Sequence, residues 1–237
     1  MDNSSLGNRM KSYEKNYSQN AVRGLPIIVR LDGKSFSKFT RRFERPFCSV
    51  MKSIMTTVAA SVAKESDARL AYTQSDEITL ILHTDNMKGM LYFDGNINKL
   101  NSILASRASS VFTKALCRVS PDYLDEDVHI SFDCRSFVVP SKDEAVNALL
   151  WRYKDCLKNS VSQVASCYFK HKELLGKSRS DRIRMLERIG VFWHKYPEIF
   201  KEGSFLLKNG GYNVHEFTTR FDEMDFNEKI SFVFDKD

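Results

Sequence analysis

Residues 69–83 read RLAYTQSDEITLILH, two apolar stretches joined by a short polar segment that contains Asp76 and Glu77. The stretches at 68–74 and 78–83 are rich in strand-forming residues, and apolar side chains recur at every second position of the latter. They predict the two strands of a β-hairpin, with the adjacent carboxylates at its tip or flank. Such a pair belongs either to a solvated turn or to a metal site, because hard cations prefer oxygen ligands.

The hairpin lies inside a regular order of predicted elements. Residues 26–32 predict a largely buried strand that ends at an Asp-Gly pair, and 49–64 predict a helix with Ser49 as its N-cap. Residues 97–118 predict a long helix, and 128–139 predict another strand. The resulting β-α-β-β-α-β order is that of the ferredoxin-like fold. It predicts an α+β protein whose antiparallel sheet carries two helices on one face.

The second half of the chain is mainly helical and basic. Residues 142–168 predict a helix that starts near Ser141, with Glu144 three residues later in a capping-box pattern. Helical, basic sequence continues to about residue 200. A short β-like tail follows, consisting of FLLKN at 205–209 and ISFVF at 230–234.

The sequence has no Gly/Pro-rich linker between its two halves. We therefore expect a core at 1–140 and a helical, basic C-terminal region at 141–237. The second part is expected to pack on the first as one compact unit.

Composition narrows the class of protein. The 237 residues are 42% hydrophobic and 28% charged, which is typical of a globular chain rather than a disordered one. No apolar run reaches the ~18 residues of a membrane span, and the polar N-terminus lacks the apolar centre of a secretory signal. These features predict a soluble, cytoplasmic protein. The five cysteines are scattered without zinc-like spacing, which predicts reduced structural thiols.

Positive charge is concentrated in two places. The formal net charge is +6, and residues 170–188 contain seven basic and three acidic side chains. A second cluster consists of Lys34, Lys38, Arg41, Arg42 and Arg45. Grouped basic residues favour a polyanionic partner, either nucleic acid or nucleotide phosphates.

Two acidic positions are predicted to meet. In the ferredoxin-like order the first and third strands are neighbours, so Asp32 and Asp76 should lie at one edge of the sheet. Two carboxylates with a backbone carbonyl suit Mg²⁺, which uses few protein ligands, and two such ions can assist reaction at phosphorus. Gly33 allows close backbone approach, and the next three residues offer amides and a positive charge to a triphosphate. The same residues also fit an ordinary turn and a solvated loop, so both interpretations stay open here.

Six segments resemble, in order and spacing, the tRNA-His guanylyltransferase superfamily over about residues 9–205. They are RLDGKSFSKF (30–39), FERP (43–46), AYTQSDE (71–77), KLNSILASRASS (99–110), FDCRSFVVPS (132–141) and WRYKDC (151–156). The resemblance implies that residues 1–140 form the catalytic core, a polymerase-like palm related to nucleotide cyclases, and that the region at 141–237 binds tRNA. It also implies a nucleotidyltransferase that adds nucleotides to the 5′ end of tRNA in the 3′→5′ direction, with ATP and GTP or other NTPs as substrates.

The resemblance implies roles for individual residues. Asp32, Asp76 and the Gly33 carbonyl would hold two Mg²⁺ ions, and Glu77 would support the catalytic carboxylates. Nucleotide and phosphate contacts would come from Arg30, Asp32, Gly33, Lys34, Ser35, Phe36, Ser37, Arg45, Ser75, Asp76, Lys99, Lys201 and Gly203. The family further implies a homotetramer built as a dimer of dimers, with the acceptor end of tRNA as its partner.

Departures from the family pattern concern the subtype. Where the eukaryotic tRNA-His enzymes have His-Ile-Asn-Asn-Leu-Tyr-Asn, residues 157–163 read LKNSVSQ, and segments 6–14 and 171–178 resemble the Thg1-like branch. That branch extends 5′-truncated tRNA by templated addition. Ser37 stands where some relatives have His, and Cys48 replaces an Asp that can read guanine. These changes favour use of all four nucleotides.

The alternatives are addition of guanosine at position −1 of tRNA-His, a nucleotide cyclase, and an RNA-binding module without turnover. Two residues outside the acidic motifs have simpler expectations. Trp151 is expected in the core, and Arg152 is expected to form either an ion pair or an RNA contact.

Overall fold

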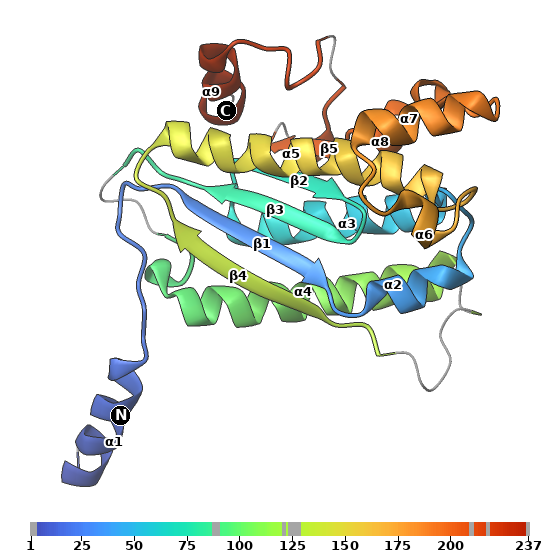
Figure 1. The fold of residues 1–237 in the computed structure, drawn as a ribbon. Helices are drawn as coiled ribbons and strands as arrows, with labels where there is room; N and C mark the ends of the chain where they lie inside the picture. The colour runs from blue at the N-terminus through green and yellow to red at the C-terminus, as the bar shows by residue number, and fades with distance from the viewer. Residues whose placement is uncertain are drawn as a thin grey trace.

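The structure is a computed structural model, and it describes residues 4–86, 91–119, 122, 129–208, 211–216 and 219–235. These residues contain one antiparallel sheet of six strands in the order β4-β1-β3-β2-β5-β6 (Figure 1). The predicted neighbours β1 and β3 lie side by side in its interior. The strands are β1 (Ile27–Gly33), β2 (Leu70–Gln74), β3 (Glu77–Leu82), β4 (Phe132–Val138), β5 (Ser204–Lys208) and β6 (Tyr212–Val214).

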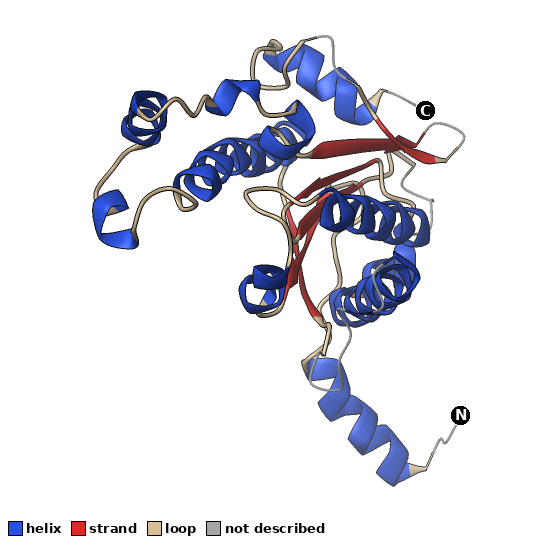
Figure 2. Ribbon diagram, turned by 90° about the vertical axis from the view of Figure 1, so that its right-hand side faces the viewer, coloured by secondary structure: helices blue, strands red, loops and turns tan. Residues whose placement is uncertain are grey.

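Helices cover both faces of the sheet (Figure 2). Helices α3 (Ser49–Ser66) and α4 (Ile97–Val119) pack on one face, as predicted, and α5 (Lys142–Ala165) packs on the other. The remaining helices are α1 (Ser5–Asn16), α2 (Phe36–Phe39), α6 (His171–Leu174), α7 (Arg179–Arg188), α8 (Glu198–Lys201) and α9 (Phe226–Phe234). Short 3₁₀ turns are η1 (Thr40–Arg42), η2 (Tyr92–Gly95) and η4 (Trp193–Lys195).

The two-residue period of β1 divides its side chains between two cores. Val29 and Leu31 join the core under α3 and α4, whereas Ile28 joins the core under α5. Helix α4 shows the helical counterpart of this pattern, because its fully buried residues recur at intervals of four: Leu100, Leu104, Ala108, Phe112 and Leu116. These apolar patterns fix which way each element faces.

The prediction for the tail was half correct. FLLKN contains most of β5, which pairs with β2 and therefore extends the sheet of the first half. ISFVF is helical instead of extended, because it belongs to α9. Asp225 and Glu228 form a capping box at the start of α9, and Phe232 and Val233 then face the α5 core.

Smaller differences concern element ends. The N-cap of α3 is Cys48 rather than Ser49, since the Cys48 Sγ accepts a hydrogen bond from the Met51 amide at 3.5 Å. The Ser141 cap of α5 is confirmed. The predicted strand at 128–139 begins only at Phe132, and Val128 lies outside the described residues. None of the described helices is long and apolar enough to cross a membrane.

Candidate active site

The first acidic motif meets the second at the end of β1. In the β1–β3 register Asp32 lies opposite Glu77, and the Gly33 amide donates to the Asp76 carbonyl at 3.1 Å. On its other side β1 pairs with β4, which sets Asp133 opposite Asp32. Antiparallel pairing thus brings three acidic segments, separated by more than 40 residues along the chain, to one edge of the sheet.

The hairpin turn consists of Ser75 and Asp76. Ser75 has a left-handed backbone with φ of 49°, and its hydroxyl donates to the Asp76 carboxylate at 2.9 Å. Glu77 is already the first residue of β3. Asp76 and Glu77 therefore have different surroundings: Asp76 is partly exposed in the turn, and Glu77 is buried.

The carboxylates at this edge repel one another. Burial raises the pKa of Asp32, and the negative charges of Asp76, Glu77 and Asp133 raise it further against the opposing effect of Arg30. Burial also raises the pKa of Asp76. A cation placed between Asp32 and Asp76 would relieve this repulsion.

The donor set fits Mg²⁺ better than a softer metal. Within the described ranges no group of three or more His, Cys, Asp or Glu side chains is arranged to hold a metal ion. Two carboxylates and the neighbouring Gly33 carbonyl provide hard oxygen donors and leave positions for water and phosphate, which is the usual environment of Mg²⁺.

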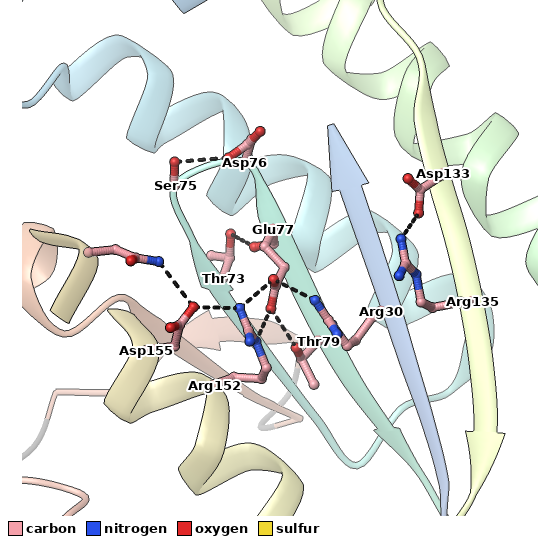
Figure 3. A network of polar contacts seen from close by, with 11 residues as sticks. Arg30, Thr73, Ser75, Asp76, Glu77, Thr79, Asp133, Arg135, Arg152 and Asp155 are labelled. Carbon is pink, nitrogen blue, oxygen red and sulfur yellow. Dashed lines mark hydrogen bonds and ion pairs between the residues drawn. The ribbon is translucent and has the colours of Figure 1, made fainter. Parts of the chain in front are cut away.

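Glu77, the first residue after the turn, is the centre of a polar network (Figure 3). Its two carboxylate oxygens accept from the Arg152 Nε and Nη2 at 2.6 and 2.7 Å, and Oε2 also accepts from Arg30 at 3.1 Å. Arg152 in turn pairs with Asp155 at 3.0 Å. Glu77 therefore links β3 to β1 and α5, and its charge is balanced by two guanidinium groups.

Arg152 forms the ion pair that was one of its two expected roles, but Trp151 is not a core residue. Its side chain is 53% exposed, with the guanidinium carbons of Arg30 and Arg152 lying 5.2 and 4.6 Å from its ring centroid. The reason is helix phase. Leu149 and Tyr153 face the core, so the position between them turns toward solvent.

The turn after β1 is tightly built. A Cβ on Gly33 would lie 2.4 Å from the Phe36 Cδ2, so only glycine fits beside this ring. The Lys34 amide donates to the Ser131 carbonyl at 2.9 Å and is therefore not available to a phosphate, contrary to expectation. The side chains of Lys34, Ser35 and Ser37 are exposed, and the first amides of α2 have no intrahelical acceptor.

Three cationic residues of the predicted site lie in different places relative to the carboxylates at the end of β1. Arg45 lies with Ser75 and Gly203 around one pocket beside the hairpin turn. Lys201 is buried, and its ammonium donates to the His194 carbonyl at 2.9 Å. Lys99 is in the first turn of α4, at the opposite end of the sheet from Asp32, and is not brought to this edge (Figure 1).

Two residues near the site were missed from the sequence. Asp133 alternates with Arg135 along β4, and this two-residue spacing could have placed both on the face that carries Asp32. Lys52 lines the pocket beside Ser75. Its signal was a lysine in the first turn of the apolar pattern at 49–64.

Comparison with known proteins agrees with this geometry. The sequence profile described as "Thg1: tRNAHis guanylyltransferase" matches residues 7–140, more than half of the chain. The chain belongs to this family. As a member it is a nucleotidyltransferase that acts in tRNA processing and binds nucleotides, and its sheet and helices form the family's palm-like fold.

Similar proteins cover almost all of the chain. A bacterial tRNA(His) guanylyltransferase (Thg1)-like protein in complex with ATP shares 30% identity with a TM-score of 0.89, over 97% of this chain and 100% of that one. A second structure, a bacterial Thg1-like protein in complex with GTP, has 28% identity and a TM-score of 0.80 over the same shares. An uncharacterized protein of Acanthamoeba polyphaga mimivirus is 30% identical over 99% of this chain and 90% of its own length.

Proposed function

We propose that this chain is a template-dependent 3′→5′ RNA polymerase that repairs the 5′ end of truncated tRNA. The observation that carries the proposal is the meeting of Asp32 and Asp76 at the end of β1, directly beside the turn at 33–37 with its exposed Lys34, Ser35 and Ser37. Two observations support assignment of the chain to the Thg1-like branch: the departure from the tRNA-His pattern at 157–163 and the likeness to bacterial Thg1-like proteins.

The proposed reaction has two steps. The 5′-phosphate of the tRNA first attacks the α-phosphorus of ATP and releases pyrophosphate, unless the RNA already carries a triphosphate. The 3′-hydroxyl of the incoming NTP then attacks the activated 5′ phosphorus, and AMP or pyrophosphate leaves. Both steps need charge neutralisation and alignment more than covalent help from the protein.

The chain's own residues have separate tasks in this proposal. Asp32, Asp76 and the Gly33 carbonyl would hold two Mg²⁺ ions, which when bound supply charge neutralisation at phosphorus and activation of the attacking oxygen. The exposed side chains of Lys34, Ser35 and Ser37 would contact the triphosphate, and Phe36 would hold the turn in place. Glu77 would position β3 through its contacts to Arg152 and Arg30.

The basic region at 170–188 is proposed to contact the tRNA backbone. Arg182 donates to the Ser162 hydroxyl, and Gln163 donates to the Pro46 carbonyl at 2.6 Å, so the end of α5 joins this region to the segment beside the hairpin turn. Bound tRNA would therefore approach the carboxylates from the same side. We include in the proposal a homotetramer arranged as a dimer of dimers, which is supported by the family resemblance alone.

The test uses a tRNA that lacks its first nucleotide, incubated with Mg²⁺ and each NTP. The wild-type chain should extend the 5′ end with the nucleotide complementary to the template. Asp32→Asn and Asp76→Asn should each lower the rate by at least about 10³-fold, because each removes a charged oxygen donor. Asp133→Asn is the matched control: this carboxylate lies beside Asp32 but pairs with Arg135, and its loss should cost much less.

The outcomes separate the alternatives. Absence of 5′ extension by the wild-type chain would rule out the proposal. Addition restricted to guanosine on tRNA-His would assign the narrower guanylyltransferase activity, which the family description favours. Consumption of NTP without RNA would indicate a cyclase, and tight RNA binding that EDTA leaves unchanged, without turnover, would indicate a binding module.

A further inference from the structure

A small pocket opens beside the hairpin turn. Its volume is about 200 Å³, below the roughly 300 Å³ at which sites for drug-sized ligands begin, so it has room for one flat ring system. The rings of Phe47 and Phe200 stack in its wall, with centroids 5.1 Å apart and planes 5° from parallel. The remaining wall is partly apolar, with Phe43, Pro46, Met51, Cys156 and Ile199. It also contains polar side chains, which are Thr40, Glu44, Arg45, Lys52, Gln74, Ser75, Gln163 and Ser166.

Three charged side chains line the pocket, Glu44, Arg45 and Lys52, and of these Lys52 comes from α3. The Lys52 ammonium donates to the Thr73 carbonyl at 3.4 Å, a long hydrogen bond that uses one of its three protons. No carboxylate of the described residues lies within 4.0 Å of it. Burial lowers the pKa of Lys52 to about 8, so the group is still mainly protonated at neutral pH. Burial of the Lys52 ammonium without a carboxylate partner lowers the stability of the fold. Its two remaining N–H donors are therefore available to bind a ligand.

The position of the pocket relates it to the nucleotide. Ser75, which precedes Asp76, and Arg45 lie at its rim. A nucleotide whose phosphates lie at Asp76 and the 33–37 turn could therefore place its base between the apolar walls. Aromatic walls of this kind accept any base by stacking, so discrimination between bases must come from the polar groups.

We propose that Lys52 is the specificity-determining residue of this pocket, where it donates hydrogen bonds to a base that carries a carbonyl oxygen and so favours guanine over adenine. Lysine has donors and no acceptor. The major-groove edge of guanine presents two acceptors, O6 and N7, whereas adenine presents N7 and a donor amino group at the same edge. Two cations line the pocket: Arg45 is exposed, whereas Lys52 is largely buried and comes from α3. This inference rests on the proposed function, since it assumes that the nucleotide binds there.

The experiment compares the affinities of four magnesium nucleoside triphosphates by calorimetry, using the wild-type chain. GTP and ITP carry O6, whereas ATP and 2-aminopurine riboside triphosphate do not. Wild-type protein should prefer the first two by about tenfold, the size expected for one good base contact. Lys52→Met keeps the length of the side chain and removes its donors, and it should reduce this preference to within about twofold. Lys64→Met, at an exposed position of the same helix outside the pocket, should leave the preference unchanged.

The result that would overturn the inference is an unchanged GTP-to-ATP affinity ratio in Lys52→Met, or an equal loss for all four nucleotides. Lys52→Gln, which keeps an amide donor and adds an acceptor, provides a second variant if Lys52→Met does not fold, and it should lower the preference. If Lys52→Met changes the GTP-to-ATP affinity ratio but the wild-type chain does not extend tRNA, base selection by Lys52 is supported and the proposed function is ruled out. If the wild-type chain extends tRNA but Lys52→Met leaves the affinity ratio unchanged, the proposed function is supported and base selection by Lys52 is ruled out.

Discussion

At the residue scale, the buried contact between Glu77 and Arg152 has the largest energetic consequence. Their side chains are 9% and 8% exposed, and the two short hydrogen bonds between them join β3 to α5. A buried ion pair adds little over well-packed apolar groups, but loss of one partner leaves an uncompensated charge. The pair therefore restricts which substitutions the site tolerates. It also holds Glu77 opposite Asp32, where a freely moving carboxylate would disturb the catalytic edge.

Arg152→Met is expected to lower the free energy of unfolding by roughly 3 kcal/mol or more, because the Glu77 carboxylate is left with Arg30 and a long hydrogen bond from Thr79. Urea denaturation measures this change. The matched control is Arg135→Met, which breaks an exposed pair with Asp133 and should cost less than about 1 kcal/mol.

A second substitution distinguishes lost charge balance from lost packing. Adding Glu77→Gln to Arg152→Met should restore part of the lost stability, since the unpaired charge is then gone. Equal stability of the single and double variants would contradict this explanation.

At the element scale, the start of β5 fits closely against β2. Gly203 has a left-handed backbone with φ of +77°, and a Cβ there would lie 2.7 Å from the Tyr72 ring and 2.8 Å from the Thr73 carbonyl. The Tyr72 hydroxyl donates to the Glu202 carbonyl at 2.8 Å, which fixes the approach of the chain to the sheet. Gly203 also lines the pocket beside Ser75. The glycine at position 203 is therefore required by the packing of β5 on β2, in addition to its predicted contact with the nucleotide.

Gly203→Ala should destabilise the protein more than Gly190→Ala, by roughly 1–3 kcal/mol. The two glycines have nearly the same backbone conformation, with φ of +77° and +79°, but nothing lies within 4 Å of a Cβ at Gly190. The difference between the two variants in thermal or urea unfolding thus isolates steric conflict from backbone strain, which both share. Equal losses would mean that β5 moves away from Tyr72 without cost.

At the scale of the whole molecule, positive charge and the acidic edge lie at the same end. Helices α6 and α7 carry most of the basic cluster and lie near the end of the sheet at which β1 stops (Figure 1). Several of its cations have structural contacts, since Arg182 donates to Ser162 and Arg184 pairs with Asp181. Lys172, Lys177 and Arg188 are exposed. These three are the best candidates for contacts to RNA phosphates.

Replacement of Lys172, Lys177 and Arg188 by alanine should weaken tRNA binding and lower the slope of log affinity against log salt concentration by roughly 2–3, about one for each phosphate contact. Binding measured between 50 and 200 mM salt tests this. The control removes two lysines and one arginine from the α3–α4 face: Lys64, Lys114 and Arg118, all exposed. A similar loss in both triple variants would show that net charge, rather than this region, attracts the RNA.

The order of elements in the core could be predicted from the sequence, because it follows from local signals: alternation along strands, helical spacing and a short hairpin that fixes its own register. The meeting of Asp32 with Asp76 could be predicted as well, because the first and third strands are neighbours in the ferredoxin-like order. The resemblance added the family, which the profile and the structural matches confirmed. The roles of the individual site residues stay predictions.

Features that depend on distant partners could not be predicted from the sequence. Arg152 reaches Glu77 across 75 positions of sequence, and Lys52 gains its apolar surroundings from segments near residues 45, 156 and 200. Trp151 is exposed because of the phase of α5, and the ISFVF segment is helical because a capping box and the α5 core outweigh its strand-like composition. The physical reason is the same in each case. Burial and charge pairing depend on which elements pack together, and a local sequence pattern does not specify these contacts.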